Sequence, residues 1–321
     1  MSVKAGALRF NTDSLKMELF DGNQWVEIVA TSPEAQTGGA RGVFGGGINP
    51  ALTNTIEYIT INSTGNAINF GDLSVGRQGL SSLSSLSRGL FAGGAAPAEV
   101  NVIDYITIAS TGDVSDFGDL IDPLFNLSSC SSSTRGIFSG GRLTPANYNT
   151  IQYVTIASTG EAKDFGDLLS QTQQTASCSS STRGIIAGGD NTIQYITIAS
   201  TGNASDFGDL TVARNNLSGC SNSTRGLFAG GFTPTSNVID YITISTLGNA
   251  VSFGNPSVNR SNYGSCSSST RGVFGGGAVP GVVYNAIDYV TISSTGDAID
   301  FGDLSTTTSN LAACSNGHGG L

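Results

Sequence analysis

Side chains capable of catalysis are few in this sequence. The single histidine, His318, lies in a glycine-rich C-terminal stretch, so Ser-His-Asp or Cys-His catalysis has one candidate base. We expect His318 to be a solvent-exposed tail residue. Among the loop acids that do not recur, Asp122 and Asp190 stand apart and do not suggest the paired carboxylates of a glycosidase. We therefore expect no catalytic residues and no enzymatic activity.

Acidic residues also recur at short, regular spacing. The best examples are Asp113, Asp116, Asp119, Asp297, Asp300 and Asp303. Three carboxylates at this spacing could hold Ca²⁺, which takes several oxygen ligands, but aspartate equally stabilises turns and strand ends. No dedicated calcium loop is present. We predict no metal and no other cofactor, and a calcium site in these turns stays open as an alternative.

The five cysteines occupy one repeated position. Four of them lie five residues before a repeated arginine, the fifth takes the same place near the C-terminus, and Leu83 fills the sixth position. The cysteines are Cys130, Cys178, Cys220, Cys266 and Cys314. Equivalent positions in neighbouring repeats lie too far apart for a disulfide. We predict buried, reduced thiols, with a metal or redox role as the alternative.

Composition narrows the class of protein. The chain has 321 residues, 44 of them glycine, and only 12% are charged. The hydrophobic content of 38% is enough for a core, which argues against a disordered chain. A net charge of −10 argues against binding to nucleic acid or to an anionic membrane. No segment approaches the roughly 20 apolar residues of a transmembrane helix.

Six segments share one pattern that begins with Arg-Gly. Their arginines are Arg41, Arg88, Arg135, Arg183, Arg225 and Arg271. Each segment contains an apolar run ending in glycines, an alternating stretch around a tyrosine, a Ser-Thr-Gly turn leading to Phe-Gly-Asp, and a small-residue stretch. In the second copy these are Leu90–Gly94, Ile103–Ile108, Ser110–Leu120 and Ser129–Thr134. This pattern predicts four short strands per copy.

Four strands in about 45 residues, repeated six times, predict an all-β chain with a six-bladed β-propeller. The double glycine and the two aromatic positions resemble the kelch repeat over about residues 41–321. Phenylalanine stands where kelch blades usually have tryptophan, so the resemblance supports the fold more than a kelch-family partner. The small-residue stretch missing before Arg41 follows the sixth copy at 310–315. We expect this C-terminal strand to complete the first blade and close the ring.

The repeated arginines sit in the turn that begins each copy. The structural interpretation is that each donates to backbone carbonyls or to an acid near the Ser-Thr-Gly turn, such as Asp113, Glu161 or Asp297. A ligand-binding ring of arginines is the alternative. Exposure of all six without partners would contradict the structural interpretation.

One face of the predicted ring has loops that differ between copies in length and sequence. A rigid scaffold with one variable loop face is typical of a recognition module, although neutral drift would also produce variation. Aromatic and arginine side chains are frequent anchors at binding surfaces. The candidate binding residues, all expected to be exposed, are Phe125, Arg142, Tyr148, Phe232, Arg260 and Tyr263.

Residues 1–34 do not share the repeat and predict a small β-meander arm, joined by a linker at 35–40 to the propeller at 41–321. Two or three strands with so little core need a partner surface. The candidate anchoring residues are Phe10, Leu19, Phe20 and Trp25. The run Gly6–Thr12, with Asp21-Gly22 and Trp25-Val26, resembles a short β-module of structural virion proteins in tailed bacteriophages, marine cyanophages especially.

That resemblance implies attachment of a distal domain to a virus particle, within a homo-oligomer. We therefore predict a tail-fibre or appendage protein, made in the host cytoplasm and located in the virion. Its partners would be other virion proteins and a host-surface glycan or protein, without nucleic acid or membrane insertion. The alternatives are a capsid decoration protein without a receptor role, a glycan-active propeller enzyme, and a cellular kelch-type interaction module.

Overall fold

Every regular element in the described part of the chain is a β-strand, as the alternating sequence pattern predicts. The computed structural model describes residues 4, 6–11, 16–27, 40–232 and 236–321. The chain divides into two units, Met1–Gln36 and Thr37–Leu321. The boundary falls within the predicted linker at 35–40, of which 35–39 lie outside the described residues. No described helix is long and apolar enough to span a bilayer.

The smaller unit contains a three-stranded antiparallel sheet of β1 (Leu8–Asn11), β2 (Lys16–Phe20) and β3 (Trp25–Glu27). Its second turn is held by the Asp21 carboxylate, which accepts backbone N–H bonds from Asn23 and Gln24. This local turn chemistry sets the register of β2 and β3. The predicted meander is therefore present in the described residues of the arm.

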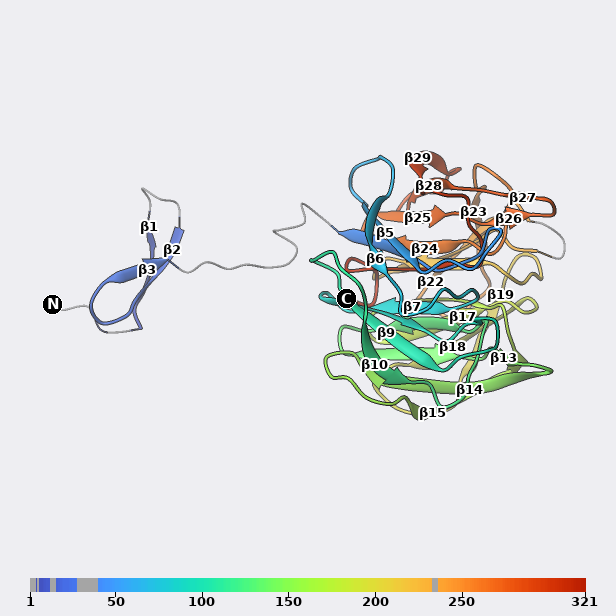
Figure 1. Cartoon of the computed structure of the whole chain (residues 1–321), viewed down its shortest axis with the longest axis horizontal. Coiled ribbons are helices and arrows are strands. Elements are labelled where there is room, and N and C mark those ends of the chain that lie inside the picture. The colour runs from blue at the N-terminus through green and yellow to red at the C-terminus, as the bar shows by residue number, and fades with distance from the viewer. Residues whose placement is uncertain (1–3, 5, 12–15, 28–39, 233–235) are drawn as a thin grey trace. The chain divides into compact units, whose positions relative to one another are not determined.

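The larger unit contains multiple four-stranded antiparallel sheets (Figure 1). Sheet 1 has the order β30 (Ala312–Ser315), β4 (Arg41–Gly45), β5 (Thr55–Thr60) and β6 (Ile68–Asp72). Sheet 2 has β7 (Ser81–Ser84), β8 (Arg88–Ala92), β9 (Val102–Thr107) and β10 (Ser115–Asp119). Sheet 3 has β11 (Ser128–Ser131), β12 (Arg135–Ser139), β14 (Ala146–Thr155) and β15 (Lys163–Thr172), with β13 (Arg142–Leu143) beside β14.

The remaining sheets repeat this order along the chain. Sheet 4 has β16 (Ala176–Ser179), β17 (Arg183–Ala187), β18 (Thr192–Thr197) and β19 (Ser205–Asp209). Sheet 5 has β20 (Ser218–Ser221), β21 (Arg225–Ala229), β22 (Ile239–Thr243) and β23 (Val251–Gly254). Sheet 6 has β24 (Gly264–Ser267), β25 (Arg271–Gly275), β28 (Ala286–Thr291) and β29 (Ile299–Asp303), and β26 (Ala278–Val279) and β27 (Val282–Val283) form a separate hairpin.

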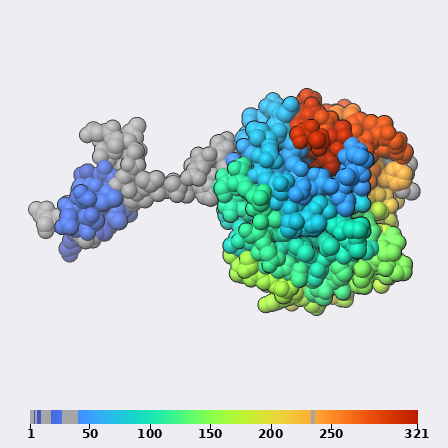
Figure 2. Space-filling view, in the orientation of Figure 1, coloured from blue at the N-terminus to red at the C-terminus, as the bar shows by residue number. Residues whose placement is uncertain are grey.

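Strand β30 pairs with β4, so the segment after the sixth repeat completes the first sheet as the sequence predicts. In Figure 2 red C-terminal residues of the larger unit lie against its blue residues. The register places Cys314 opposite Val43 and Ala313 opposite Phe44. This all-β arrangement of four-stranded sheets is compatible with a propeller.

The hydrophobic core lies between neighbouring sheets. In one cluster Leu90 and Phe117 of sheet 2 pack with Phe138 of sheet 3, and all three side chains are at least 98% buried. The register shift between Asp116 and Gly118 makes a bulge in β10 at Phe117. Tyr105 of β9 meets Phe117 edge-on, with ring centroids 6.1 Å apart. The repeated tyrosine and phenylalanine make the same edge contact in the other sheets, and the tyrosine packs, partly buried, against the core.

Backbone hydrogen bonds also join the last strand of each sheet, which we call the outer strand, to a turn of the next sheet. Gly112 N–H in the Ser-Thr-Gly turn of sheet 2 donates to the Phe70 carbonyl of sheet 1, and Val114 N–H donates to the Asp72 carbonyl. The same bonds join sheet 6 to sheet 1, where Gly65 N–H donates to the Phe301 carbonyl. The outer edge of each sheet is thus partly capped by its neighbour.

Candidate functional site

The two ends of the strands in the larger unit differ. We call "turn end" the end that carries the turns before Arg-Gly and the Ser-Thr-Gly turns, and "loop end" the end that carries the loops after the double glycines and the links between sheets. Antiparallel pairing places these two groups at opposite ends, as the sequence predicts. The first strand of each sheet, which we call the inner strand, runs from the loop end to the turn end and contributes polar side chains to both.

Serine hydroxyls join the six inner strands β7, β11, β16, β20, β24 and β30. The last serine of each strand donates from Oγ to the backbone carbonyl of the equivalent serine in the preceding sheet, over 2.6–2.8 Å. The order is Ser131, Ser84, Ser315, Ser267, Ser221, Ser179 and back to Ser131. The bonds form a closed circuit, because Ser84 donates to Ser315 at the far end of the chain.

A second closed circuit surrounds the inner strands at the loop end. The residue two positions before the start of each inner strand has a left-handed backbone, with φ between 54° and 62°. These residues are Gly79, Asn126, Gln174, Asn216, Asn262 and Asn310. The backbone N–H of each donates to the carbonyl of its counterpart in the preceding sheet over 2.7–3.1 Å. We call these six residues the "amide ring", because five of them have side-chain amides.

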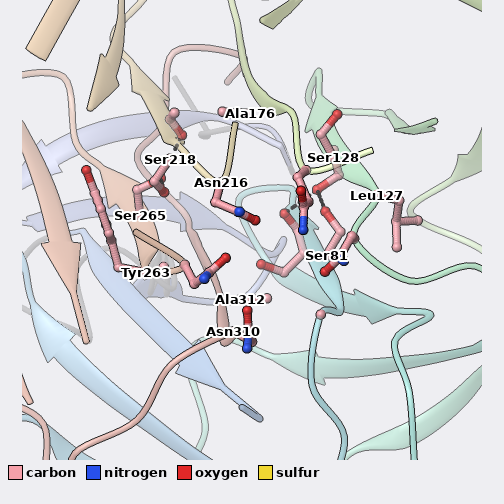
Figure 3. A pocket seen from close by; sticks show the side chains of 18 of the residues that line it. Ser81, Leu127, Ser128, Ala176, Asn216, Ser218, Tyr263, Ser265, Asn310 and Ala312 are labelled. Carbon is pink, nitrogen blue, oxygen red and sulfur yellow. Dashed lines mark hydrogen bonds between the residues drawn. The ribbon is translucent and has the colours of Figure 1, made fainter. Parts of the chain in front are cut away.

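The amide ring surrounds a cavity of about 150 Å³. Below the ring the cavity is lined by the first residues of the inner strands, including Ser81, Ser128 and Ala176. Figure 3 shows these side chains converging from several sheets on a common space. A smaller cavity of about 60 Å³ lies among the cysteine-bearing positions of the same strands and is lined by His318. The inner strands therefore enclose a polar space that reaches the loop end.

At the turn end the tail lies across the inner strands, so the expectation of a solvent-exposed His318 is wrong. His318 is partly buried, and its Nε2 lies 2.9 Å from the Ser84 carbonyl oxygen. Gly320 N–H donates to Nδ1 over 3.1 Å, so the ring is neutral with its proton on Nε2. Burial lowers the pKa of His318. A Cβ on Gly320 would lie 1.8 Å from the Ser131 carbonyl oxygen, which shows how closely the tail packs there.

The repeated arginines have the structural role that the sequence predicts. Arg135 donates from Nη1 to the Ile198 carbonyl of the next sheet over 2.9 Å, and its guanidinium lies 4.5 Å from the centroid of Tyr153. The other five make the same two contacts, and Arg271 of sheet 6 reaches the Ile61 carbonyl of sheet 1. The turn acids are not their partners. These contacts tie each sheet to the next.

The turn acids accept backbone N–H bonds instead. Asp113 accepts from Asp72 over 3.0 Å, and Glu161 accepts from Asp119 over 3.1 Å. In other sheets the neutral Asn203 and Asn249 accept the equivalent bond. Because an amide does the same work, the negative charge is not needed. No group of three or more His, Cys, Asp or Glu residues in the described ranges is arranged to hold a metal ion.

The five cysteines are buried, unpaired thiols, as the sequence predicts. Burial raises the pKa of Cys130 to about 12. Its Sγ would lie 2.6 Å from a Cβ on Gly184 in the next sheet, and the Arg-Gly glycines of the other sheets meet Cys or Leu83 in the same way. The glycine that follows each repeated arginine therefore makes room for the Cys or Leu83 side chain of the preceding sheet.

The predicted binding residues divide into two groups. Phe232 is 40% exposed and Phe125, Arg142 and Tyr148 are partly buried at the loop end. Phe125 and Arg142 exchange backbone hydrogen bonds of 3.0 and 2.9 Å, and Tyr148 lies in the same hairpin as Arg142. Phe232 belongs to another sheet. The structure thus brings three of the predicted residues together.

The expected exposure of Arg260 and Tyr263 is wrong. Arg260 is fully buried, because its guanidinium binds Asp288 over 2.7 Å and the Phe274 carbonyl over 3.2 Å. Tyr263 is 5% exposed and packs edge-on against Phe274, with centroids 5.9 Å apart. A carboxylate from the next sheet makes burial of the arginine possible, and local sequence does not show that contact.

In the arm, Phe20 and Trp25 are paired across β2 and β3, with ring centroids 5.3 Å apart. Arg9 lies over the Trp25 ring at 4.2 Å and binds Glu18 at 2.7 Å. Leu19 lies on the opposite face and is 38% exposed. The side chain of Phe10 lies outside the described residues. Two of the predicted anchors therefore pack on each other, and Leu19 faces solvent.

The amide ring and the docked tail were not predicted from the sequence. The sequence does contain a signal for the amide ring, because residues that tolerate a left-handed backbone, Asn and Gly above all, precede the small-residue stretch in five of six copies.

No protein-family model matches the chain, and no curated protein matches it.

Proposed function

We propose that residues 41–321 form a closed six-bladed propeller, a non-catalytic recognition module that binds its partner at the loop end. Three sets of contacts support the closed ring: the serine circuit, the backbone circuit of the amide ring, and the arginine contacts to the next sheet. Each set includes a bond between the first and last sheets. Such closure leaves little flexibility between blades and presents loops on a fixed frame.

The difference between the two ends carries the proposal. At the turn end the copies are nearly identical and the tail covers the inner strands through His318. At the loop end the loops differ in length and chemistry, and the 150 Å³ cavity lies among them. The group of Phe125, Arg142 and Tyr148 adds an aromatic and cationic site on the same end. Recognition at the loop end fits this asymmetry best.

The arm is proposed to attach the ring to a larger assembly, the virion of a tailed bacteriophage, as a fibre or appendage protein. Register places Leu8, Leu19 and Val26 on one face of the small sheet, and they are 59%, 38% and 42% exposed. The charged pair of Arg9 and Glu18 lies on the other face. A sheet of three short strands with an exposed apolar face needs cover from other virion proteins or from other copies of the arm.

The attachment role is tested by removing residues 1–34 from the protein expressed during infection. The truncated protein should remain folded and soluble, yet be lost from purified particles. A Lys163→Ala variant, altered at an exposed position of β15, serves as the control and should be incorporated normally. Incorporation of the truncated protein at the normal level would contradict attachment through the arm.

A further inference from the structure

The cavity inside the amide ring offers a specific binding chemistry. Its lining contains side-chain amides and hydroxyls, and includes no Asp, Glu, Lys, Arg or His among the described residues. Anions and cations would therefore find no opposite charge there, and the net charge of −10 further disfavours a polyanion. Amides and hydroxyls both donate and accept hydrogen bonds, which matches a neutral ligand rich in hydroxyl groups.

The amide ring holds its backbone fixed and leaves its side chains available. All six backbone N–H groups are used within the ring itself. The side-chain amides donate only long bonds to neighbouring residues, of 3.3–3.5 Å for Asn126, Asn216, Asn262 and Asn310. Bonds of this length lie well beyond the usual 2.9–3.0 Å. A ligand hydroxyl can replace them without disturbing the ring.

Hydroxyls are unevenly distributed around the cavity. Sheets 2 and 3 contribute the pairs Ser81-Ser82 and Ser128-Ser129, whereas sheet 1 contributes Ala312-Ala313. The Ser82 hydroxyl is buried without a hydrogen-bond partner, as is the Ser177 hydroxyl beside the same cavity. The hydroxyls of Ser81, Ser128 and Ser129 already take part in hydrogen bonds within the protein, so the unused capacity lies in Ser82 and Ser177. Sheet 1 forms an apolar side. A ring with hydroxyls on its edge and C–H groups on its face fits such a site.

Size selects among hydroxyl-bearing ligands. An apolar cavity of about 150 Å³ in another protein admits benzene, so this volume holds a six-membered ring. Larger groups attached to that ring can extend toward the variable loops. The occupant is therefore expected to be the end of a chain and not its middle.

We propose that the amide ring binds the terminal neutral pyranose of a glycan. This proposal rests on the proposed function, for which it names the class of ligand at the loop end. The amides hold the hydroxyls at the rim, the unpaired hydroxyls of Ser82 and Ser177 bind those that enter the cavity, and the remaining glycan lies along the loops.

The test measures binding of methyl pyranosides of neutral hexoses, and of a hexuronate and a hexosamine for comparison, to the full chain by calorimetry and ligand-observed NMR. The variant Asn126→Gly/Asn216→Gly/Asn310→Gly removes three amides and keeps the left-handed backbone, because Gly79 already occupies the equivalent position. Asn69→Ala, at an exposed position of β6, is the matched control. We expect a neutral pyranoside to bind the native chain and the control equally, and the triple variant at least about tenfold more weakly.

Three results would overturn the proposal: no neutral pyranoside binds, binding is unchanged in the triple variant, or a hexuronate or hexosamine is preferred. Failure of the proposed function, recognition at the loop end, is measured separately, by the binding of the protein to its partner. If a bulky polymer attached at the loop end abolishes that binding while the triple variant binds the partner normally, the cavity is not the glycan site and recognition at the loop end stands. If the pyranoside binds as expected but the loop end can be shielded without effect, recognition at the loop end is rejected.

Discussion

Three arginines are buried between the sheets, each paired with an aspartate. Arg77, Arg214 and Arg260 bind Asp104, Asp240 and Asp288 over 3.0, 2.9 and 2.7 Å, and all six side chains are at least 98% buried. Each arginine follows the outer strand of one sheet and its aspartate lies in the next. In the other sheets the arginine position holds Leu124, Thr172 or Thr308, and the aspartate position holds Gln152, Gln194 or Glu57. Arginine thus occurs only opposite aspartate.

This pattern predicts strong coupling between the two members of a pair. Arg77→Leu alone leaves the Asp104 carboxylate buried without its cation, and should lower the free energy of unfolding by about 3–5 kcal/mol. Arg77→Leu with Asp104→Gln recreates the neutral pair found at Leu124 and Gln152, and should restore most of that loss. Denaturant unfolding of both single variants and the double variant measures the coupling. A double variant as unstable as Arg77→Leu would contradict this account.

The sequence predicted residue roles well where the contact is local or repeated. The repeated arginines and cysteines have the predicted roles because each copy repeats the same surroundings. It failed for Arg260, whose burial depends on Asp288 of the next sheet, and for Tyr263, which packs in a core cluster that also contains Leu227 and Phe253 of sheet 5. The charge of Arg260 suggested that its side chain is exposed, but the Asp288 carboxylate that compensates this charge is distant in sequence. The cause of each error is a contact between sheets.

At the scale of elements, the glycine of Phe-Gly-Asp allows each outer strand to approach the next sheet. Gly118 has a φ of 140°, and a Cβ there would lie 2.5 Å from the Gly160 carbonyl oxygen. Gly160, in the facing turn, has a φ of 154° but nothing within 4 Å of such a Cβ. Substitution at Gly160 therefore introduces backbone strain alone, whereas substitution at Gly118 introduces both backbone strain and a steric clash.

Alanine at these two positions should have different effects. Gly160→Ala tests the left-handed backbone alone, whereas Gly118→Ala also forces β10 away from the turn of sheet 3. We expect Gly118→Ala to lower the free energy of unfolding by about 1–3 kcal/mol more than Gly160→Ala does. Thermal or denaturant unfolding gives the comparison. Equal losses would show that the close approach between sheets is unimportant.

The strands themselves were largely predictable, because period-two alternation and turn glycines recur in each copy. The short hairpin of β26 and β27 and the extension of β14 and β15 were not predicted. They lie in the loops that differ between copies, where no repeated pattern guides the assignment. The amide ring was also not predicted, because its backbone hydrogen bonds join segments that are distant in sequence and come together only in the folded chain.

At the scale of the whole molecule, the tail and the cavity give the two ends different properties. The tail docks through a neutral His318 whose Nδ1 accepts the Gly320 N–H. Its pKa is lowered from the ordinary 6.5 by burial, so the released tail binds a proton more readily than the docked one. Docking is therefore most stable above about pH 6.5 and weakens as the pH falls through that value toward the lowered pKa.

Hydrogen exchange at Gly319, whose N–H donates to the Ser221 carbonyl, measures this effect. Protection should be higher at about pH 8 than at about pH 5, after correction for intrinsic exchange. His318→Gln removes the titrating group and should show little dependence on pH in the same range. Equal protection of the native tail at both values would contradict a docked, neutral histidine.

The central claim is that the loop end of the ring recognises the partner. All five native cysteines are buried, so a cysteine introduced at an exposed site can be conjugated selectively to a bulky polymer. Ala98→Cys at the loop end and Thr111→Cys at the turn end lie beyond opposite ends of β9 in one sheet, and both positions are exposed. Binding of each conjugate to the partner surface is compared with binding of its unconjugated form. We predict that the polymer at 98 abolishes binding and the polymer at 111 does not. Unimpaired binding with the polymer at 98, or loss only with the polymer at 111, would contradict the claim.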